Sequence, residues 1–213
     1  MENLFQAASR CRPPLGQTLT ATREGLWAES ILEAEKSLES RQVYSGKILN
    51  LRVDRVTIPG KGEAIREVVE FHGGAAIVAL DEADRVLLIR QYRYAVDCEL
   101  WELPAGILEP GEPPAVCAAR ELQEETGYRA ARVEPLCSFY STPGGTDEML
   151  HIFVATDLVP VGSRLEADER IEVFPTLLGE ALAMIERGEI VDGKTIIGLL
   201  MLQARQVNGR RRE

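Results

Sequence analysis

The chain has 213 residues, of which 45% are hydrophobic and 27% charged, proportions typical of a globular protein and not of a disordered one. Its formal net charge of −10 argues against general binding to nucleic acids or anionic membranes, because both require basic surfaces. No apolar run approaches the roughly 18 residues that a membrane-spanning helix needs, and no signal-peptide pattern opens the sequence.

Residues 1–40 differ in pattern from the rest of the chain. The first 22 contain Pro13-Pro14 and scattered polar residues without a clear period, which predicts a flexible extension. Residues 24–38 carry apolar side chains at helical spacing and predict a short helix. This helix would pack either on the body of the protein or on a partner.

Residues 41–72 are predicted to form a small antiparallel sheet. Residues 48–56 alternate between apolar and polar side chains, Pro59-Gly60-Lys61-Gly62 predicts a turn, and residues 65–71 predict a further strand. His72-Gly73-Gly74 is interpreted as the hinge to the main domain.

The main domain is predicted over residues 73–207, followed by a tail at 208–213. Strands are expected at 75–80, 86–92, 133–140, 150–156 and 171–174, and helices at 113–126, 177–187 and 194–206. Residues 100–105 are expected to lead into the loop that begins at Gly106. Strands in the middle with helices before and after them predict an α/β (α+β) fold, in which a mixed central sheet lies between helical layers.

The stretch 106–128 is predicted to be a loop that runs into a helix. Gly106 and Gly111 permit backbone conformations that other residues resist, and Pro113-Pro114 suits the first turn of a helix. Nothing breaks the helix before Gly127, which is a usual stop signal.

Three carboxylates, Glu121, Glu124 and Glu125, are predicted to share one face of this helix, with Arg120 beside them. The opposite face is expected to pack against a sheet, through Ala115, Ala118, Ala119 and Leu122. Like charges at this spacing repel one another, so a cation should compensate them. Carboxylate oxygens suit Mg²⁺ or Mn²⁺, which also bind substrate phosphates, although a solvated acidic face would explain the pattern without a metal.

The spacing across 106–128 is Gly, five residues, Glu, seven residues, Arg-Glu-Leu, one residue, Glu-Glu, one residue, Gly and an apolar residue. It resembles the signature of the Nudix hydrolases at every fixed position. The resemblance implies an α/β/α sandwich whose loop–helix–loop binds divalent metal and cleaves a nucleoside diphosphate linked to another group.

The resemblance also implies roles for individual residues. Glu121 and Glu125 would be the principal metal ligands, with Glu124 nearby and the carbonyl oxygen of Ala105 completing the shell. Arg120 would orient the carboxylates. Glu112 would brace the loop or join through water.

A further carboxylate is expected from the loop at residues 165–170. By the same resemblance Glu169 is the candidate that completes metal binding or acts as a general base, with Glu166 and Asp168 as alternatives. A solvated acidic loop is the simpler interpretation.

Motifs that flank the signature resemble the ADP-ribose pyrophosphatase branch of this family over roughly residues 43–205. They are Pro143, sixteen positions after Gly127, and the stretches 101–106 and 90–94. The resemblance implies hydrolysis of ADP-ribose to AMP and ribose 5-phosphate. Other nucleoside diphosphate sugars such as GDP-mannose, dinucleotides such as NADH, and a non-catalytic nucleotide sensor are the alternatives.

Substrate contacts are expected from Arg93, whose planar fork matches phosphate oxygens, and from Pro143-Gly144. Arg66 and Glu67 resemble residues that contact adenine or ribose from a partner subunit, which implies a homodimer. A plain surface arginine is the other interpretation of Arg66.

The four cysteines show neither metal-site spacing nor a disulfide framework, which predicts reduced thiols in a cytoplasmic protein. They are Cys11, Cys98, Cys117 and Cys137. His72 and His151 are too isolated to form a zinc site or a catalytic pair, so structural roles are expected for both.

Overall fold

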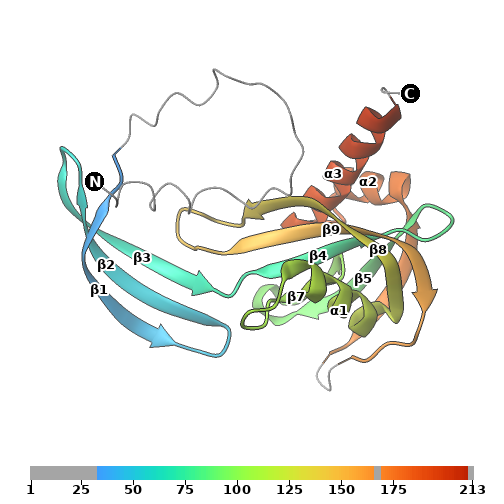
Figure 1. Cartoon of the computed structure of the whole chain (residues 1–213), viewed down its shortest axis with the longest axis horizontal. Coiled ribbons are helices and arrows are strands. Elements are labelled where there is room, and N and C mark those ends of the chain that lie inside the picture. The colour runs from blue at the N-terminus through green and yellow to red at the C-terminus, as the bar shows by residue number, and fades with distance from the viewer. Residues whose placement is uncertain (1–32, 166–168, 211–213) are drawn as a thin grey trace. The chain divides into compact units, whose positions relative to one another are not determined.

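The structure, a computed structural model, describes residues 33–165 and 169–210 (Figure 1). The chain divides into two compact units. The first comprises Met1–Phe71 and Tyr140–Glu148, and the second comprises His72–Phe139 and Met149–Glu213.

The first unit contains an antiparallel sheet of β1 (Lys36–Ser45), β2 (Leu49–Ile58) and β3 (Gly62–Phe71), in that order. The alternating pattern at residues 48–56 therefore predicted its central strand correctly. The helix expected at 24–38 falls mostly outside the described residues, and its last part is wrong because residues 36–38 begin β1. Polar side chains at Lys36, Ser37 and Ser40 sit on a fully exposed strand.

The loop at Tyr140–Glu148 belongs to the first unit because it is hydrogen-bonded to the end of β3. The backbone N–H of Val69 donates to the carbonyl oxygen of Gly145 at 2.9 Å. The N–H of Phe71 donates to Asp147 Oδ1, also at 2.9 Å. This loop carries Pro143 and Gly144, and it thereby lies next to the strand that carries Arg66.

The described residues of the second unit form two sheets and three α-helices. One sheet has the order β10-β5-β6, formed by Ile171–Leu177, Arg85–Arg93 and Cys98–Glu102. The other has the order β7-β4-β9-β8, formed by Ala105–Ile107, Gly74–Ala79, Met149–Pro160 and Tyr128–Tyr140. The helices are α1 (Pro114–Thr126), α2 (Leu178–Glu186) and α3 (Gly193–Arg210), and a short 3₁₀ turn, η1, spans Tyr94–Val96.

Strand β4 is the centre of this unit, and all six of its residues are buried. It pairs antiparallel with β7 and parallel with β9, so the sheet is mixed, as predicted. Side chains alternate between two apolar layers: Ala75 and Ile77 join the layer that includes Leu122 of α1, whereas Val78 joins the layer of α2 and α3. Figure 1 shows α1 on one side of β4 and β9 and the other two helices on the opposite side.

Strands β7 and β8 differ from the expectation. Strand β7 was missed because three residues, Ala105–Ile107, are too short to produce an alternating pattern. Strand β8 begins at Tyr128, directly after the helix stop signal, and not at residue 133.

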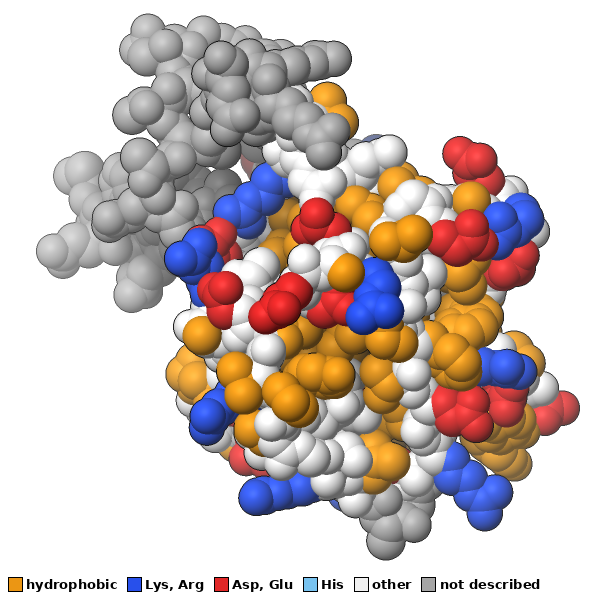
Figure 2. Space-filling view, turned by 90° about the vertical axis from the view of Figure 1, so that its right-hand side faces the viewer, with side chains coloured by type: hydrophobic (Ala, Val, Ile, Leu, Met, Phe, Trp, Pro, Cys, Tyr) orange, Lys and Arg blue, Asp and Glu red, His pale blue; other side chains and the backbone are white. Residues whose placement is uncertain are grey.

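No helix in the described ranges is long and apolar enough to cross a membrane. On the face drawn in Figure 2, acidic and basic side chains are interspersed around exposed apolar ones.

Candidate active site

Helix α1 carries the acidic residues, and it begins and ends close to the predicted positions. Pro114 occupies the first turn, and Gly127 ends the helix in the left-handed conformation with φ of 75°. The expected division of its faces is wrong, however. Glu121 and Glu125 are buried on the same side as Ala118 and Leu122, because 3.6 residues per turn bring positions 118, 121, 122 and 125 within an arc of about 100°.

Glu125 lies at the centre of the candidate site and is 3% exposed. Its Oε2 atom accepts a hydrogen bond from the backbone N–H of Ala105 at 2.9 Å. Burial raises the pKa of Glu125 to about 8, and repulsion from Glu121 and Glu169 adds to that effect, whereas the Ala105 hydrogen bond opposes it. With a pKa of about 8 the Glu125 carboxyl group is mostly protonated at neutral pH, and a bound cation would be needed to keep it charged.

Glu121 is 9% exposed, and burial raises its pKa even though Arg120 opposes the shift. Its carboxylate packs against the backbone of Gly106. A Cβ atom at position 106 would lie 1.8 Å from Glu121 Oε1, so only glycine leaves room for the carboxylate there.

Arg120 is the cation of the helix and contacts three carboxylates. Its Nη1 atom donates to Glu121 Oε1 at 2.7 Å and to Glu124 Oε2 at 3.0 Å, and its Nε atom donates to Glu112 Oε1 at 3.0 Å. Glu112 also accepts a hydrogen bond from the N–H of Glu109, which closes the loop ahead of the helix. Arg120 therefore connects Glu112, in the loop ahead of α1, with two carboxylates of the helix.

The segment that leads to Glu169 is hydrogen-bonded to the end of α1. The carbonyl oxygen of Gly127 accepts from the N–H of Val161 at 2.8 Å and from that of Gly162 at 3.1 Å. The negative charge of Glu169 raises the pKa of both Glu121 and Glu125, so Glu169 lies within electrostatic reach of them. The alternatives Glu166 and Asp168 lie outside the described residues.

Arg93 lies within electrostatic reach of Glu125, whose charge helps to raise the pKa of Arg93 after that of Glu102. It forms a bidentate ion pair with Glu102, in which Nε donates at 2.6 Å and Nη2 at 2.7 Å. Glu102 also accepts from Lys194 Nζ. No role for Glu102 or Lys194 was predicted from the sequence, and no local signal identifies this pair, because the two residues are 92 positions apart.

The remaining predicted substrate residues lie in the first unit. Arg66 and Glu67 are on β3, where Arg66 forms an ion pair with Glu35 at 2.6 Å. The loop with Pro143 and Gly144 is hydrogen-bonded to the same strand. The structure therefore brings these four residues together on one unit.

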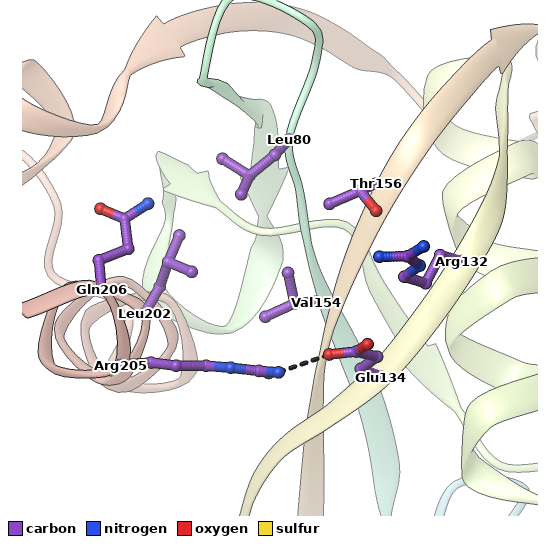
Figure 3. A pocket seen from close by; sticks show the side chains of 8 residues that line it. All are labelled: Leu80, Arg132, Glu134, Val154, Thr156, Leu202, Arg205 and Gln206. Atoms are coloured by element: carbon purple, nitrogen blue, oxygen red, sulfur yellow. Dashed lines mark hydrogen bonds and ion pairs between the residues drawn. The ribbon is translucent and has the colours of Figure 1, made fainter. Parts of the chain in front are cut away.

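The second unit has a hollow of about 230 Å³ (Figure 3), and the carboxylates of α1 are not among its lining residues. It sits near Leu80, just beyond the carboxyl end of β4, whereas Ala105 pairs near the amino end of that strand. None of the predicted site residues is among its lining residues, which are Leu80, Arg132, Glu134, Val154, Thr156, Leu202, Arg205 and Gln206. Figure 3 shows Arg205 reaching from α3 to Glu134 across the hollow.

His151 is half-buried and is hydrogen-bonded to Ser138 Oγ at 2.8 Å, with a pKa lowered by burial. This contact between neighbouring strands agrees with a structural role.

The donor set fits a hard divalent cation. Glu121, Glu124 and Glu125 supply carboxylate oxygens and Ala105 a carbonyl oxygen, and burial raises the pKa values of Glu121 and Glu125, so a bound cation would favour their charged forms. Within the described ranges, no three acidic, histidine or cysteine side chains stand together as a preformed ion-binding group. Arg120 holds Glu121 and Glu124 in this structure, so a cation would have to share these two carboxylates with Arg120.

Comparison with known proteins agrees with this geometry. The NUDIX domain family model matches residues 70–187, and the model of the nucleoside diphosphate sugar hydrolase N-terminal domain matches residues 35–69.

Three curated relatives are similar over much of their length. The ADP-ribose pyrophosphatase of Bacillus subtilis is 36% identical over 174 residues, which cover 81% of this chain and 94% of the relative. The ADP-ribose pyrophosphatase of Mycobacterium tuberculosis is 40% identical, covering 79% and 83%. The GDP-mannose pyrophosphatase of Citrobacter koseri is 41% identical over a shorter 150 residues, covering 65% and 78%.

A solved structure described as an ADP compounds hydrolase superposes with a TM-score of 0.75. It is 20% identical in sequence and covers 85% of this chain and 98% of its own, so it supports the fold alone. The signature in and around α1, the mixed sheet and the match over residues 70–187 together identify the chain as a member of the Nudix hydrolase family.

Proposed function

We propose that the protein hydrolyses the pyrophosphate bond of ADP-ribose to AMP and ribose 5-phosphate in a reaction that depends on Mg²⁺ or Mn²⁺. The observation that carries the proposal is the buried pair Glu121 and Glu125, held on α1 beside Ala105. Two relatives that are 36% and 40% identical to this chain over 174 aligned residues are ADP-ribose pyrophosphatases, which supports the choice of substrate.

The metal would be held by Glu121 and Glu125, with Glu124, Glu169 and the carbonyl oxygen of Ala105 as further ligands. When bound, it would neutralise the phosphate oxygens and lower the pKa of the attacking water. Ala105 orients Glu125 through its backbone N–H.

Three side chains complete the mechanism. Arg120 fixes the positions of Glu121 and Glu124 by its two hydrogen bonds to them. Arg93 binds a phosphate oxygen through its guanidinium group. Glu169 either completes the metal shell or accepts the proton of the attacking water, for which it must come within hydrogen-bonding distance of that water.

Arg66, Glu67, Pro143 and Gly144 are proposed to bind the adenosine or ribose portion of the substrate. Their grouping on the first unit, through the hydrogen bonds between β3 and the loop, supports a common role. A cytoplasmic location is proposed as well, and the described cysteines Cys98, Cys117 and Cys137 are free thiols, as a reducing compartment favours.

GDP-mannose is the second candidate substrate, because the Citrobacter koseri relative is a GDP-mannose pyrophosphatase. The placement of Pro143 and the greater length of the match to ADP-ribose pyrophosphatases favour ADP-ribose. A non-catalytic sensor is disfavoured because the chain retains Glu112, Glu121 and Glu125, and losing such carboxylates is what would be expected of a sensor.

The test is product analysis with ADP-ribose, GDP-mannose, NADH and diadenosine polyphosphates, each with and without Mg²⁺. We expect metal-dependent release of AMP from ADP-ribose, reduced by about 10³-fold or more in Glu125→Gln. Faster hydrolysis of another substrate would overturn the choice of ADP-ribose. Tight binding of ADP-ribose without turnover of any substrate would overturn the enzyme assignment.

A homodimer is proposed because the first unit exposes apolar side chains on its sheet, among them Tyr44 and Ile65. Both lie on one face, since Tyr44 pairs with Leu51, Ile65 pairs with Arg55, and residues 51 and 55 are an even number of positions apart. Light scattering should give twice the chain mass. Ile65→Lys should shift the measured molar mass toward that of one chain, whereas Ser40→Lys, on the other face of the sheet, should leave it unchanged. A wild-type protein with the mass of one chain would contradict the proposal.

A further inference from the structure

Glu102 is a carboxylate that is 1% exposed and has two cationic partners. Arg93 occupies both of its oxygens, and Lys194 Nζ shares the Oε2 atom. A buried carboxylate costs several kcal/mol unless donors satisfy it, so both cations contribute to keeping Glu102 charged. Burial on its own would raise the pKa of Glu102, and these two partners bring it below its usual value.

Lys194 belongs to the first turn of α3, and its neighbour Thr195 makes a parallel contact. The backbone N–H of Leu103 donates to Thr195 Oγ1 at 2.8 Å, and Thr195 is fully buried. Asp192 in turn accepts from Thr195 Oγ1 at 2.6 Å. Two consecutive residues of α3 therefore contact two consecutive residues, 102 and 103, of the segment that leads into the loop ahead of α1.

The ion pair fixes one edge of Arg93 and leaves the other for a ligand. Nε and Nη2 face Glu102, whereas Nη1 donates to no residue in the described ranges. The Arg93 side chain is 37% exposed, so it lies at the boundary between the buried carboxylate and solvent. Because a guanidinium group is planar, an anchor on one edge determines the direction of the free edge.

We propose that Lys194 is a positioning residue of the active site: by fixing Glu102 it holds the Arg93 guanidinium group toward the phosphates of the substrate. Position 194 lies beyond the residues that the NUDIX family model matches, which end at 187. The inference rests on the proposed function, because it takes Arg93 to bind the substrate.

The physical reason is the sharing of Oε2. With Lys194 present, Glu102 is held from two directions, by α3 and by Arg93 of β5. Without Lys194 the Glu102 carboxylate is hydrogen-bonded to Arg93 alone, so the ion pair can rotate as a unit. The Nη1 edge of the Arg93 guanidinium group is then no longer held toward the substrate. A misplacement on the order of 1 Å in such a group costs about 100-fold in rate.

The experiment measures kcat, KM and the thermal midpoint for Lys194→Met, Lys194→Arg, Arg93→Gln and the double variant of Lys194→Met with Arg93→Gln. Arg205→Met is the matched control, since it removes one positive charge from the same helix at an exposed ion pair with Glu134. We expect kcat/KM of Lys194→Met to fall about 10- to 100-fold, with the loss mainly in KM, and Lys194→Arg to recover part of it.

In the Arg93→Gln background, Lys194→Met should lower kcat/KM further by less than about threefold, because both changes remove the same interaction. Loss of folding stability alone would not produce this non-additivity. Activity of Lys194→Met within twofold of Arg205→Met, or penalties that multiply in the double variant, would overturn the inference.

Lys194→Met leaves a buried carboxylate with one cation, so it can also lower stability. Glu102→Gln combined with Lys194→Met removes one charge of each sign and leaves Arg93, which is partly exposed to solvent. We expect the thermal midpoint of this variant to recover while kcat/KM stays low, and recovery of both would assign Lys194 a purely structural role. If wild-type protein leaves ADP-ribose intact, the proposed function fails, and the same variants are measured on the substrate that the panel identifies.

Discussion

The backbone N–H of Arg164 donates to the carbonyl oxygen of Glu124 at 2.9 Å and so joins the segment ahead of Glu169 to the last turn of α1. Two further hydrogen bonds, from Val161 and Gly162 to the carbonyl oxygen of Gly127, extend the contact. These hydrogen bonds hold the segment ahead of Glu169 against α1, and the charge of Glu169 acts on Glu121 and Glu125 although they are more than 40 positions away in the sequence.

Gly127→Ala should separate this segment from α1. A Cβ atom at position 127 would lie 2.7 Å from the backbone nitrogen of Ser163, and the φ of 75° adds strain for any L-residue. We expect kcat to fall about tenfold or more, because Glu169 loses its placement relative to Glu121 and Glu125. Steady-state kinetics with ADP-ribose and thermal unfolding measure the two effects.

Gly188→Ala is the control for Gly127→Ala. Gly188 also follows a helix, has φ of 74° and has nothing within 4 Å of the position of a Cβ atom. Both variants should lose about 1–2 kcal/mol of stability from backbone strain, and only Gly127→Ala should lose activity. Equal kinetics in the two variants would contradict the proposed role of the contact.

Gly106→Ala should displace a metal ligand without straining the backbone, because its φ is not positive. The added Cβ would lie 1.8 Å from Glu121 Oε1, which forces the carboxylate away from the loop. We expect affinity for Mn²⁺, titrated by electron paramagnetic resonance, to fall about 10- to 100-fold. Gly179→Ala on α2 has open space around the position of its Cβ atom and no positive φ, so it should bind Mn²⁺ as the wild type does. Unchanged affinity in Gly106→Ala would contradict the ligand assignment.

The sequence predicted local features of the site well. The prolines at 113 and 114 and the glycine at 127 mark the ends of α1 correctly, because helix termini depend on a few adjacent residues. The faces of α1 were misassigned although the information was present, since positions 118 and 125 are seven residues apart and nearly coincide in angle. Glu125 is therefore a core-facing carboxylate, and its burial explains its raised pKa.

Long-range contacts could not be predicted from the sequence. The hydrogen bonds from β3 to the loop at Tyr140–Glu148, and the contacts of Lys194 and Thr195 with residues 102 and 103, join positions about 75 to 92 residues apart. No periodic pattern records such a pairing. Lys194 was interpreted only as the start of an apolar helix, because a single lysine carries no signal of its buried partner.

Arg120→Gln should destabilise the metal-free protein and increase its response to metal. The change leaves Glu112, Glu121 and Glu124 without their shared cation, so the carboxylates repel one another. We expect a lower thermal midpoint in EDTA and a larger rise on addition of Mg²⁺ than in the wild type, because the metal would then supply the missing charge. Differential scanning fluorimetry measures both midpoints.

Arg187→Gln is the control for Arg120→Gln, since Arg187 also bridges two carboxylates, Glu180 and Glu189, but at the surface. Solvent screens such pairs, so its midpoint should change little and should not gain in response to Mg²⁺. An Arg120→Gln variant that responds to Mg²⁺ no more than this control would contradict the idea that Arg120 and the metal share these carboxylates.

Glu125 should make the metal-free protein less stable as the pH rises. Its pKa is raised to about 8 in the folded protein and is about 4.3 in an unfolded chain, so the folded state binds the extra proton between these values. The stability that the protonated Glu125 contributes is therefore fully present below the unfolded pKa and is lost as the pH rises toward 8, by up to about 1.4 kcal/mol per pH unit.

Glu125→Gln keeps an oxygen for the Ala105 N–H and removes the ionisation. In EDTA at pH 8 we expect the variant to unfold at a higher temperature than the wild type, and at pH 4.5 the two proteins should unfold at similar temperatures. Adding Mg²⁺ at pH 8 should reduce the difference between the two midpoints, because the metal would stabilise the charged carboxylate of the wild type. If the difference between the two thermal midpoints did not change across this pH range, Glu125 would already be charged in the metal-free protein. Burial of Glu125 would then give no reason to expect a compensating metal ion.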